Sequence, residues 1–386
     1  MRADELSARA RAIHFSSLVL DAHADTPQRL FFDQFDLGRR DAEGCVDIPR
    51  LREGGVGAIF LALWVPVEIT GAAATLRARS LLDVTLKQIE IHGADLALCT
   101  SSKEVRAARA ENKIAVLLGV EGGHAIDSDF AILREFGARG VRYMTLTHNA
   151  ATEWADSSND APRHNGLTDF GKQVIREMNR LGMLVDVSHV SDQTFYDVLE
   201  TSRAPVIASH SCCRALCDAP RNLDDAMIKA LASRGGVIHI TFHDSFLSQE
   251  YANAKRALAS EIASREQAVS EKVGENEAQN LMALQRLSDE SIRAGKLPQV
   301  SWEKIVDHLD HAASIAGADH VGIGSDFDGA FMPAGMEDAS KFPSLTEGLL
   351  GRGYADADIR KILGENTLRV MYDAQRIGEM PAPENP

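Results

Sequence analysis

The sequence lacks a hydrophobic run long enough to cross a membrane. No apolar stretch in its 386 residues approaches the ~20 residues that a bilayer-spanning helix needs. The first residues, MRADELSARARAIHFSSLVL, also lack the apolar core and the small-residue cleavage site of a secretory signal. We therefore expect a cytoplasmic protein with no membrane partner.

Basic residues are fewer than acidic residues. The chain has 41 Lys and Arg residues against 56 Asp and Glu residues, so its formal net charge is −15. A field of this sign repels nucleic-acid phosphates and anionic lipid headgroups. We expect no nucleic-acid partner.

Cysteine and proline are both scarce. The five cysteines are odd in number and show no paired Cys-x-x-Cys spacing, which is typical of reduced thiols rather than of a disulfide framework. Only 12 prolines accompany 45% hydrophobic and 25% charged residues. This composition excludes a fibrous or disordered chain and predicts a globular protein with a large core.

Short apolar segments recur along the chain, each bounded by glycine or polar residues. Their near-continuous apolarity is typical of parallel strands that are buried on both faces. They are residues 18–24, 57–65, 114–120, 141–148, 183–189, 205–210, 236–242 and 321–326. Helical patterns lie between several of them, at 73–92, 168–181, 191–201, 223–233 and 302–316. The alternation predicts an α/β fold, a (β/α)8 TIM-type barrel, with a doubly wound open sheet as the alternative.

One segment interrupts this alternation. Residues from about 245 to 300 are charged and helical in pattern, and they far exceed the usual connection of about 2–6 residues. We expect a helical insertion after the seventh strand, near the barrel mouth. Residues 1–386 would then form a single barrel domain that ends in a frayed tail at 380–386.

Ionisable side chains gather where the predicted strands end. Six strand ends carry histidine or carboxylate: Asp21, His23 and Asp25; Glu121; His148; Asp186 and His189; His210; and Asp326. Because barrel active sites are built at the carboxyl ends of strands, these side chains should meet at one mouth. Any one such histidine alone is more often a packed, hydrogen-bonded core residue. Their coincidence favours a metal, since buried ionisable groups are costly without a counter-charge.

The residue types favour two metal ions. His23 and Asp25 alternate along a strand, so both project to the same face. Mixed imidazole and carboxylate ligands suit zinc or a similar divalent ion, and one Zn²⁺ takes about three protein ligands. The candidate ligands exceed that number: His23, Asp25, Glu121, His189 and His210. Because a carboxylate can bridge, the sequence predicts two zinc ions or similar divalent metals per chain.

Other motifs are weaker candidates. Glu121-x-x-His124 has the spacing of a di-iron helix motif but contains two glycines, so His124 is interpreted as structural. His308-x-x-His311 falls on an amphipathic helical pattern and is interpreted as part of a solvated face. The chain has no His-Glu-x-x-His, Gly-x-Ser-x-Gly or P-loop motif, which excludes zincins, standard α/β-hydrolases and P-loop enzymes.

Six motifs follow one another along residues 18–375. They are DAHADTP, GVEGGHAI, LTHNAATEWAD, VDVSHVS, ASHSCCRALCDAPRNLDD and GIGSDFDG. In this order they resemble the membrane (renal) dipeptidases and their bacterial homologues, which are binuclear zinc members of the amidohydrolase superfamily. The resemblance implies that His23 and Asp25 hold one metal. His189 and His210 would hold the other, bridged to the first by Glu121.

The resemblance also implies roles in catalysis. His148 would contact the scissile carbonyl or its oxyanion, Arg221 the substrate carboxylate, and Asp326 would transfer the proton. His243 stands where mammalian members have a tyrosine that helps to hold the carboxylate, so carboxylate recognition is expected to differ. The implied activity is hydrolysis of small dipeptides by a hydroxide that bridges two metals. Acceptance of a D-residue at the C-terminal position is left open.

Two alternative functions stay open. The same centre would also serve an amidohydrolase acting on N-acyl amino acids or lactams, since the metals recognise an amide rather than a particular peptide. A catalytically silent member would instead bind or tailor a peptide-like metabolite in the same pocket. The sequence also leaves a homodimer open.

Overall fold

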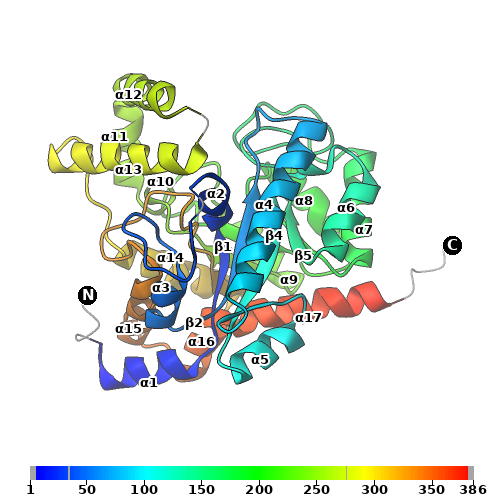
Figure 1. The fold of residues 1–386 in the computed structure, drawn as a ribbon, viewed down its shortest axis with the longest axis horizontal. Helices are drawn as coiled ribbons and strands as arrows, with labels where there is room; N and C mark the ends of the chain where they lie inside the picture. The colour runs from blue at the N-terminus through cyan, green and yellow to red at the C-terminus, as the bar shows by residue number, and fades with distance from the viewer. Residues whose placement is uncertain (1–5, 34, 275, 381–386) are drawn as a thin grey trace.

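Parallel strands close into a barrel that is surrounded by helices (Figure 1). The computed structural model describes residues 6–33, 35–274 and 276–380. The barrel strands are β1 (Val19–Ala24), β2 (Val56–Trp64), β4 (Ile114–Glu121), β5 (Val141–Thr145), β6 (Leu184–Asp186), β7 (Ile207–Ser211), β8 (Val237–Ile240) and β9 (Val321–Ile323). Because β1 pairs with both β2 and β9, and β2 pairs with β4, the ring has no open edge. The predicted (β/α)8 barrel is confirmed, and the open sheet is wrong.

All eight predicted apolar segments are barrel strands. Every residue of β1 and β4 is buried, which explains why these segments read as continuous apolar runs. A further strand, β3 (Leu96–Leu98), pairs with β4 beside the barrel. It was not predicted, because only Leu96 of its three residues is buried, so it lacks the continuous buried run of the barrel strands.

Five of the outer helices come from the predicted helical stretches between the strands. Helices α4 (Ala72–Ile91), α7 (Asp169–Arg180), α8 (Asp192–Thr201), α9 (Asp225–Ser233) and α14 (Glu303–Ala316) match the predicted ranges within two residues at each end. Side-chain caps mark three of these starts: Thr168, Ser191 and Asp224 each accept a hydrogen bond from the backbone amide three residues on. Local sequence therefore fixes where these helices begin.

Several helices had no counterpart in the prediction. They are α1 (Ala8–Ser16), α2 (Thr26–Phe32), α3 (Ile48–Glu53), α5 (Ser102–Ala110), α6 (Phe130–Ala138), α15 (Pro343–Gly351), α16 (Asp356–Arg360) and α17 (Asn366–Glu379). Helix α17 packs at the amino ends of the strands, where Leu368 and Met371 join a core cluster with Leu20. The barrel is therefore closed at the end opposite its mouth.

The predicted insertion after the seventh barrel strand is helical, as expected. After β8 the chain forms α10 (Asp244–Leu247), α11 (Gln249–Ala257), α12 (Ala259–Val273) and α13 (Glu277–Arg293). Tyr251 of α11 is buried against α13, with its Oη 2.7 Å from Ser288 Oγ. Asn276 donates to Asp33, just beyond α2, at 3.0 Å, which ties the insertion to the barrel.

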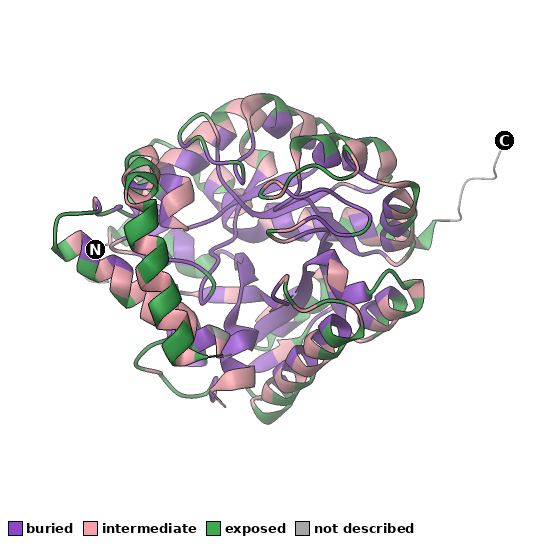
Figure 2. Ribbon diagram, turned by 90° about the horizontal axis from the view of Figure 1, so that it is seen from above, coloured by how far each residue is buried: buried purple, intermediate pink, exposed green. Residues whose placement is uncertain are grey.

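Burial is concentrated in the strands, and exposed residues lie on the surrounding helices (Figure 2). Within the described ranges, no helix is long and apolar enough to span a membrane. Of the tail predicted at 380–386, residues 381–386 lie outside the described residues.

Candidate metal centre

Glu121, the last residue of β4, lies between two sets of histidine side chains. Its Oε2 is 3.3 Å from His23 Nε2, while its Oε1 is 3.0 Å from His189 Nε2 and 3.3 Å from His210 Nε2. All four side chains are buried. They come from four different strands or the residues directly after them, so closure of the barrel is what brings them together.

Two further carboxylates extend the cluster on the His23 side. Asp25 Oδ2 lies 3.5 Å from His23 Nε2, and Asp326 offers an oxygen within 4.8 Å of ligand atoms on both residues. Gly329 packs directly against this pair. A Cβ at Gly329 would lie 1.9 Å from Asp25 Oδ2 and 2.8 Å from Asp326 Oδ1, so a larger residue there would displace the carboxylates.

Two of the site residues have unusual backbone conformations. His189 and Asp326 adopt φ values of 68° and 67°, in the left-handed region that side-chain-bearing residues seldom occupy. Each such residue costs of order 1–3 kcal/mol, and such residues cluster at functional sites. In both cases the chain turns immediately after a strand, at the barrel mouth.

Polar side chains behind the cluster orient the ligand histidines. Tyr143 Oη lies 2.8 Å from His23 Nδ1, and Ser209 Oγ lies 2.8 Å from His210 Nδ1. The Ser209 hydroxyl in turn donates to Asp186 Oδ2 at 2.6 Å, so it is free to accept from His210. Because these contacts use Nδ1, both rings present Nε2 to Glu121, which is how metal-ligating histidines are commonly held.

The sequence did not identify Tyr143 and Asp186 as supports. Tyr143 lies in β5, in a segment that the sequence predicted only as a buried strand, and its side chain is fully buried. Asp186 accepts hydrogen bonds from the backbone amides of both Ser188 and Ser209, at 3.0 and 2.8 Å. For Asp186 the available signal was a single carboxylate in an apolar strand, whereas Tyr143 lies in a strand that also contains an arginine and a threonine and gave no such signal.

The donor set fits divalent cations. Among the described residues, His23 Nε2 and Asp25 Oδ1 are buried atoms without a hydrogen-bond partner. The Nε2 atoms of His189 and His210 lie 2.9 Å apart, and both lie within 3.3 Å of Glu121 Oε1, so two imidazole nitrogens and a carboxylate oxygen converge on one point. Imidazole and carboxylate are the ligands that zinc and similar ions take.

The electrostatics of the cluster also suit a cation. Burial lowers the pKa of His210 to about 3, which keeps this ring neutral with a lone pair to offer. Burial alone would raise the pKa of Glu121, yet His23, His189 and His210 hold it well below its ordinary value. Burial, together with the nearby Asp25 carboxylate, raises the pKa of Asp326 well above its ordinary value.

A cavity of about 300 Å³ opens onto the cluster. It is bordered by every predicted site residue except His23, which is completely buried: Asp25, Glu121, His148, His189, His210, Arg221, His243 and Asp326. Phe246, Trp64 and, from the insertion, Leu281 and Leu284 supply apolar walls. The volume is at the small end of small-molecule sites, of order 300–1,000 Å³.

Arg221 presents a free donor in this cavity. Its Nη2 donates to the His210 carbonyl at 2.8 Å, and its guanidinium lies 5.4 Å from the Phe246 ring centre. Its buried Nε has no hydrogen-bond partner, and no carboxylate within the described ranges forms an ion pair with it. The group is therefore placed to receive an anionic ligand.

The two other predicted substrate residues, His148 and His243, differ in their hydrogen bonds. His148 has an unpartnered Nδ1 and lies with its ring centre 4.5 Å from that of His189; burial lowers its pKa to about 4. His243 caps α10, since its Nδ1 accepts from the Ser245 amide at 3.1 Å. Only Nε2 of His243 is thus left to meet a ligand.

The interpretation of His308 as part of a solvated face is wrong. Its side chain is fully buried: Nδ1 accepts from the Cys213 amide at 3.0 Å and Nε2 donates to the Leu247 carbonyl at 3.1 Å. His311 is half-buried and lies 2.8 Å from Asp225. The amphipathic pattern was real, but the face it predicted as solvated packs against the segments after β7 and β8.

Comparisons with known proteins agree with this geometry. A family model described as membrane dipeptidase, peptidase family M19, matches residues 7–383. Dipeptidase 3 of Macaca fascicularis is 32% identical over 394 residues, which cover 99% of this chain and 70% of that protein. The crystal structure of the probable dipeptidase PvdM from Pseudomonas aeruginosa has a TM-score of 0.80 at 26% identity, with 96% of this chain and 98% of that chain covered.

A third comparison shows the same fold. The metallopeptidase from Rhodobacter sphaeroides, liganded with a phosphinate mimic of the dipeptide L-Ala-D-Ala, has a TM-score of 0.76 at 24% identity and covers 93% of this chain and 99% of that chain. The resemblance seen in the six sequence motifs is confirmed by the whole-chain family match. The chain therefore belongs to the membrane dipeptidase family, peptidase family M19, and is a metal-dependent dipeptidase.

Proposed function

We propose that the cluster around Glu121 holds two divalent cations, zinc or ions of similar chemistry, within a single barrel domain of residues 1–386. The position of the Glu121 carboxylate supports this proposal most directly. One of its oxygens faces His23, and the other faces His189 and His210. His23 and Asp25 would hold one ion. His189 and His210 would hold the other, so that each ion has about three protein ligands when Glu121 bridges.

When bound, two such ions lower the pKa of a shared water and polarise the scissile carbonyl. Asp326 would take a proton from the attacking water and pass it to the leaving amine. Its Oδ2 accepts only a long hydrogen bond, 3.5 Å from Thr241 Oγ1, so the carboxylate is not committed to a structural partner. Its raised pKa suits a group that must gain and lose a proton.

His148 would stabilise the oxyanion. Its ring is neutral because burial lowers its pKa, so one ring nitrogen carries a hydrogen and can donate. A neutral donor held in a buried pocket stabilises developing negative charge without reorganising. His148 borders the same cavity as Glu121.

Arg221 would bind the carboxylate of the C-terminal residue of the substrate. A buried guanidinium with an unused donor selects short substrates whose C-terminus is free. His243, through Nε2, would contact the same end of the substrate. Because the Rhodobacter sphaeroides protein holds a mimic of L-Ala-D-Ala, we include dipeptides with a D-residue at the C-terminal position among the substrates.

A library of dipeptides, N-acyl amino acids and lactams tests this function through release of free amine. We expect dipeptides with L- or D-residues at the second position to be cleaved, and chelation to abolish the reaction. Faster cleavage of N-acyl amino acids or lactams would make the enzyme a different amidohydrolase. Binding of dipeptides without any turnover would indicate the silent alternative.

A further inference from the structure

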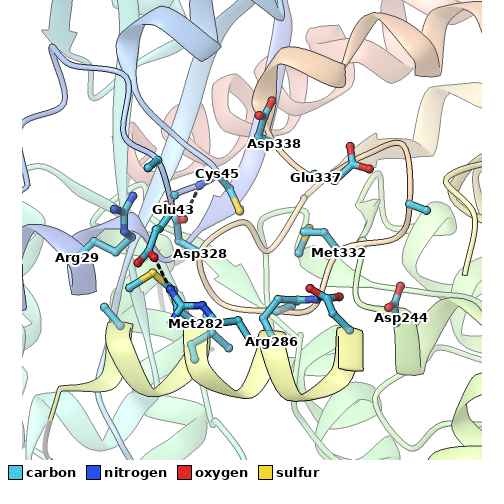
Figure 3. A pocket seen from close by; sticks show the side chains of 18 of the residues that line it. Arg29, Glu43, Cys45, Asp244, Met282, Arg286, Asp328, Met332, Glu337 and Asp338 are labelled. Atoms are coloured by element: carbon cyan, nitrogen blue, oxygen red, sulfur yellow. Dashed lines mark hydrogen bonds and ion pairs between the residues drawn. The ribbon is translucent and has the colours of Figure 1, made fainter. Parts of the chain in front are cut away.

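A second cavity, of about 530 Å³, adjoins the metal cavity beneath α13 (Figure 3). The two cavities share the lining residues Ala278, Leu281 and Asp328. The remaining walls come from α13, from the loops at residues 42–45 and 328–338, from residues 299–300, and from single residues of α2, α3 and α10. The five proposed metal ligands, all of them described, do not border it. The second cavity is thus a separate space beside the dipeptide site.

Asp244 and Asp289 place carboxylates in this cavity. In Figure 3, Asp244 lies beyond Met332, on the side opposite Arg29. Asp244 is only 2% exposed, and its Oδ1 has no hydrogen-bond partner among the described residues. Burial and the nearby Asp289 carboxylate raise the pKa of Asp244 to about 8. Ionisation of this group is therefore costly, and a positively charged ligand would offset the cost.

The arginines that line the cavity each form an ion pair, although Nε and Nη1 of Arg29 have no hydrogen-bond partner among the described residues. The pairs are Arg29 with Asp41 at 3.2 Å, Arg50 with Asp338 at 3.0 Å, and Arg286 with Glu43. Lys255 partly offsets the raised pKa of Asp244, but its Nζ pairs with Glu266 at 3.8 Å. No ion pair within 4.0 Å joins Asp244 or Asp289 to a cationic side chain in the described ranges.

Apolar side chains lie between the two ends of the cavity. Figure 3 shows Met332 between Asp328, at the wall shared with the metal cavity, and Asp244. Met282 of α13 also lines the cavity. Flexible thioether side chains adapt to an alkyl chain. Lysine and arginine bury an aliphatic stem along apolar surface and place a charged head among polar groups. An apolar passage that ends at two carboxylates matches that shape.

We propose that this cavity is a subsite for a lysine-like or arginine-like side chain on the amino-terminal residue of the substrate, with its charged head held by Asp244 and Asp289. The inference rests on the proposed function. Arg221, which would hold the other end of the dipeptide, follows β7, whereas the shared wall at Asp328 follows β9. In this proposal the carboxyl end of the substrate lies at Arg221, and its amino-terminal side chain extends past the shared wall into the second cavity.

The kinetic test compares Lys-Ala with norleucine-Ala, which differ in the terminal ammonium group. Asp244→Asn and Asp289→Asn each remove a charge with little change in shape. Each should lower the ratio of kcat/KM for Lys-Ala over norleucine-Ala by at least about tenfold, with kcat/KM for norleucine-Ala kept within about twofold. Glu337→Gln, at the same cavity, is the control for a general loss of charge and should leave the ratio unchanged.

An unchanged ratio in Asp244→Asn would overturn the subsite. An effect seen with Ala-Lys instead of Lys-Ala would overturn its assignment to the amino-terminal residue. If the wild type cleaves no dipeptide, Ala-Ala included, the proposed function fails, but the subsite remains testable by binding. Calorimetric titration into Asp326→Asn should then show tighter binding of Lys-Ala than of norleucine-Ala, and Asp244→Asn added to that variant should abolish the difference. Equal affinities of Asp326→Asn for Lys-Ala and norleucine-Ala would overturn the subsite.

Discussion

Glu121 and His23 lie on adjoining parts of the barrel mouth, with Glu121 Oε2 3.3 Å from His23 Nε2 and both side chains buried. Glu121 ends β4 and His23 lies in β1, which are separated in the sheet by β2 alone. The other oxygen of Glu121 faces His189 and His210. A single carboxylate thus connects the two sets of candidate ligands.

Asp186 should affect metal affinity without touching the metal. The Ser209 hydroxyl donates to Asp186 Oδ2 and accepts from His210 Nδ1. Asp186→Asn should therefore leave the His210 ring less firmly oriented. Loss of such an outer partner lowers metal affinity by about 10–100-fold. Competition with a chromogenic chelator measures the affinity, and kcat should recover at saturating metal. Wild-type affinity in Asp186→Asn would show that the contact does not orient His210.

Arg221→Met should weaken transition-state binding by about 2–5 kcal/mol if the guanidinium pairs with the substrate carboxylate. Amidation of the dipeptide C-terminus should harm the wild type to a similar degree and add little in the variant. The measurement is kcat/KM for both substrates in both proteins. Arg134→Met, which removes an exposed arginine paired with Glu177, is the matched control. Independent, additive losses would show that Arg221 and the carboxylate do not meet.

Asp326→Asn should lower kcat by about 10²–10⁴-fold, because the amide keeps the shape but cannot accept a proton. Metal content should stay near that of the wild type. Asp328→Asn is the control in the same loop. The Asp328 carboxylate accepts hydrogen bonds from the Thr26 hydroxyl and the Cys45 amide, so this variant should lower Tm and keep kcat near the wild-type value. Lost metal in Asp326→Asn would make the residue a ligand, and near-normal kcat would remove it from the mechanism.

His308 should make the fold sensitive to acid. Burial lowers its pKa from 6.5 to about 4, so between these values the unfolded chain binds a proton that the folded chain does not. The free energy of unfolding should therefore fall as the pH drops from 6.5 to 4, by up to about 1.4 kcal/mol per pH unit for this group. Denaturant unfolding of His308→Gln should show a shallower pH dependence than the wild type. His14→Gln should behave alike, since burial also lowers its pKa to about 4. Identical slopes in all three proteins would contradict this account.

The barrel and the clustering of the candidate ligands at its mouth were predictable because they depend on local patterns. Apolar strands that end in His23, Glu121 or His210 identify both the fold and the mouth. Contacts between distant segments were not predictable in the same way. The burial of His308 depends on where the segments carrying Cys213 and Leu247 pack, and its own helix gives no sign of that. A role for Asp244 likewise could not be predicted, because it depends on the packing of α13, which places Asp289 in the same cavity.

The metal content of Glu121→Ala tests the two-metal centre most directly. Elemental analysis should find about two equivalents of zinc or a similar ion per wild-type chain, and fewer than about one in the variant, because both ions lose a shared ligand. Glu153→Ala, at an exposed position, should keep the wild-type content. Retention of two ions in Glu121→Ala, or undiminished dipeptide hydrolysis by metal-free wild type, would contradict the account.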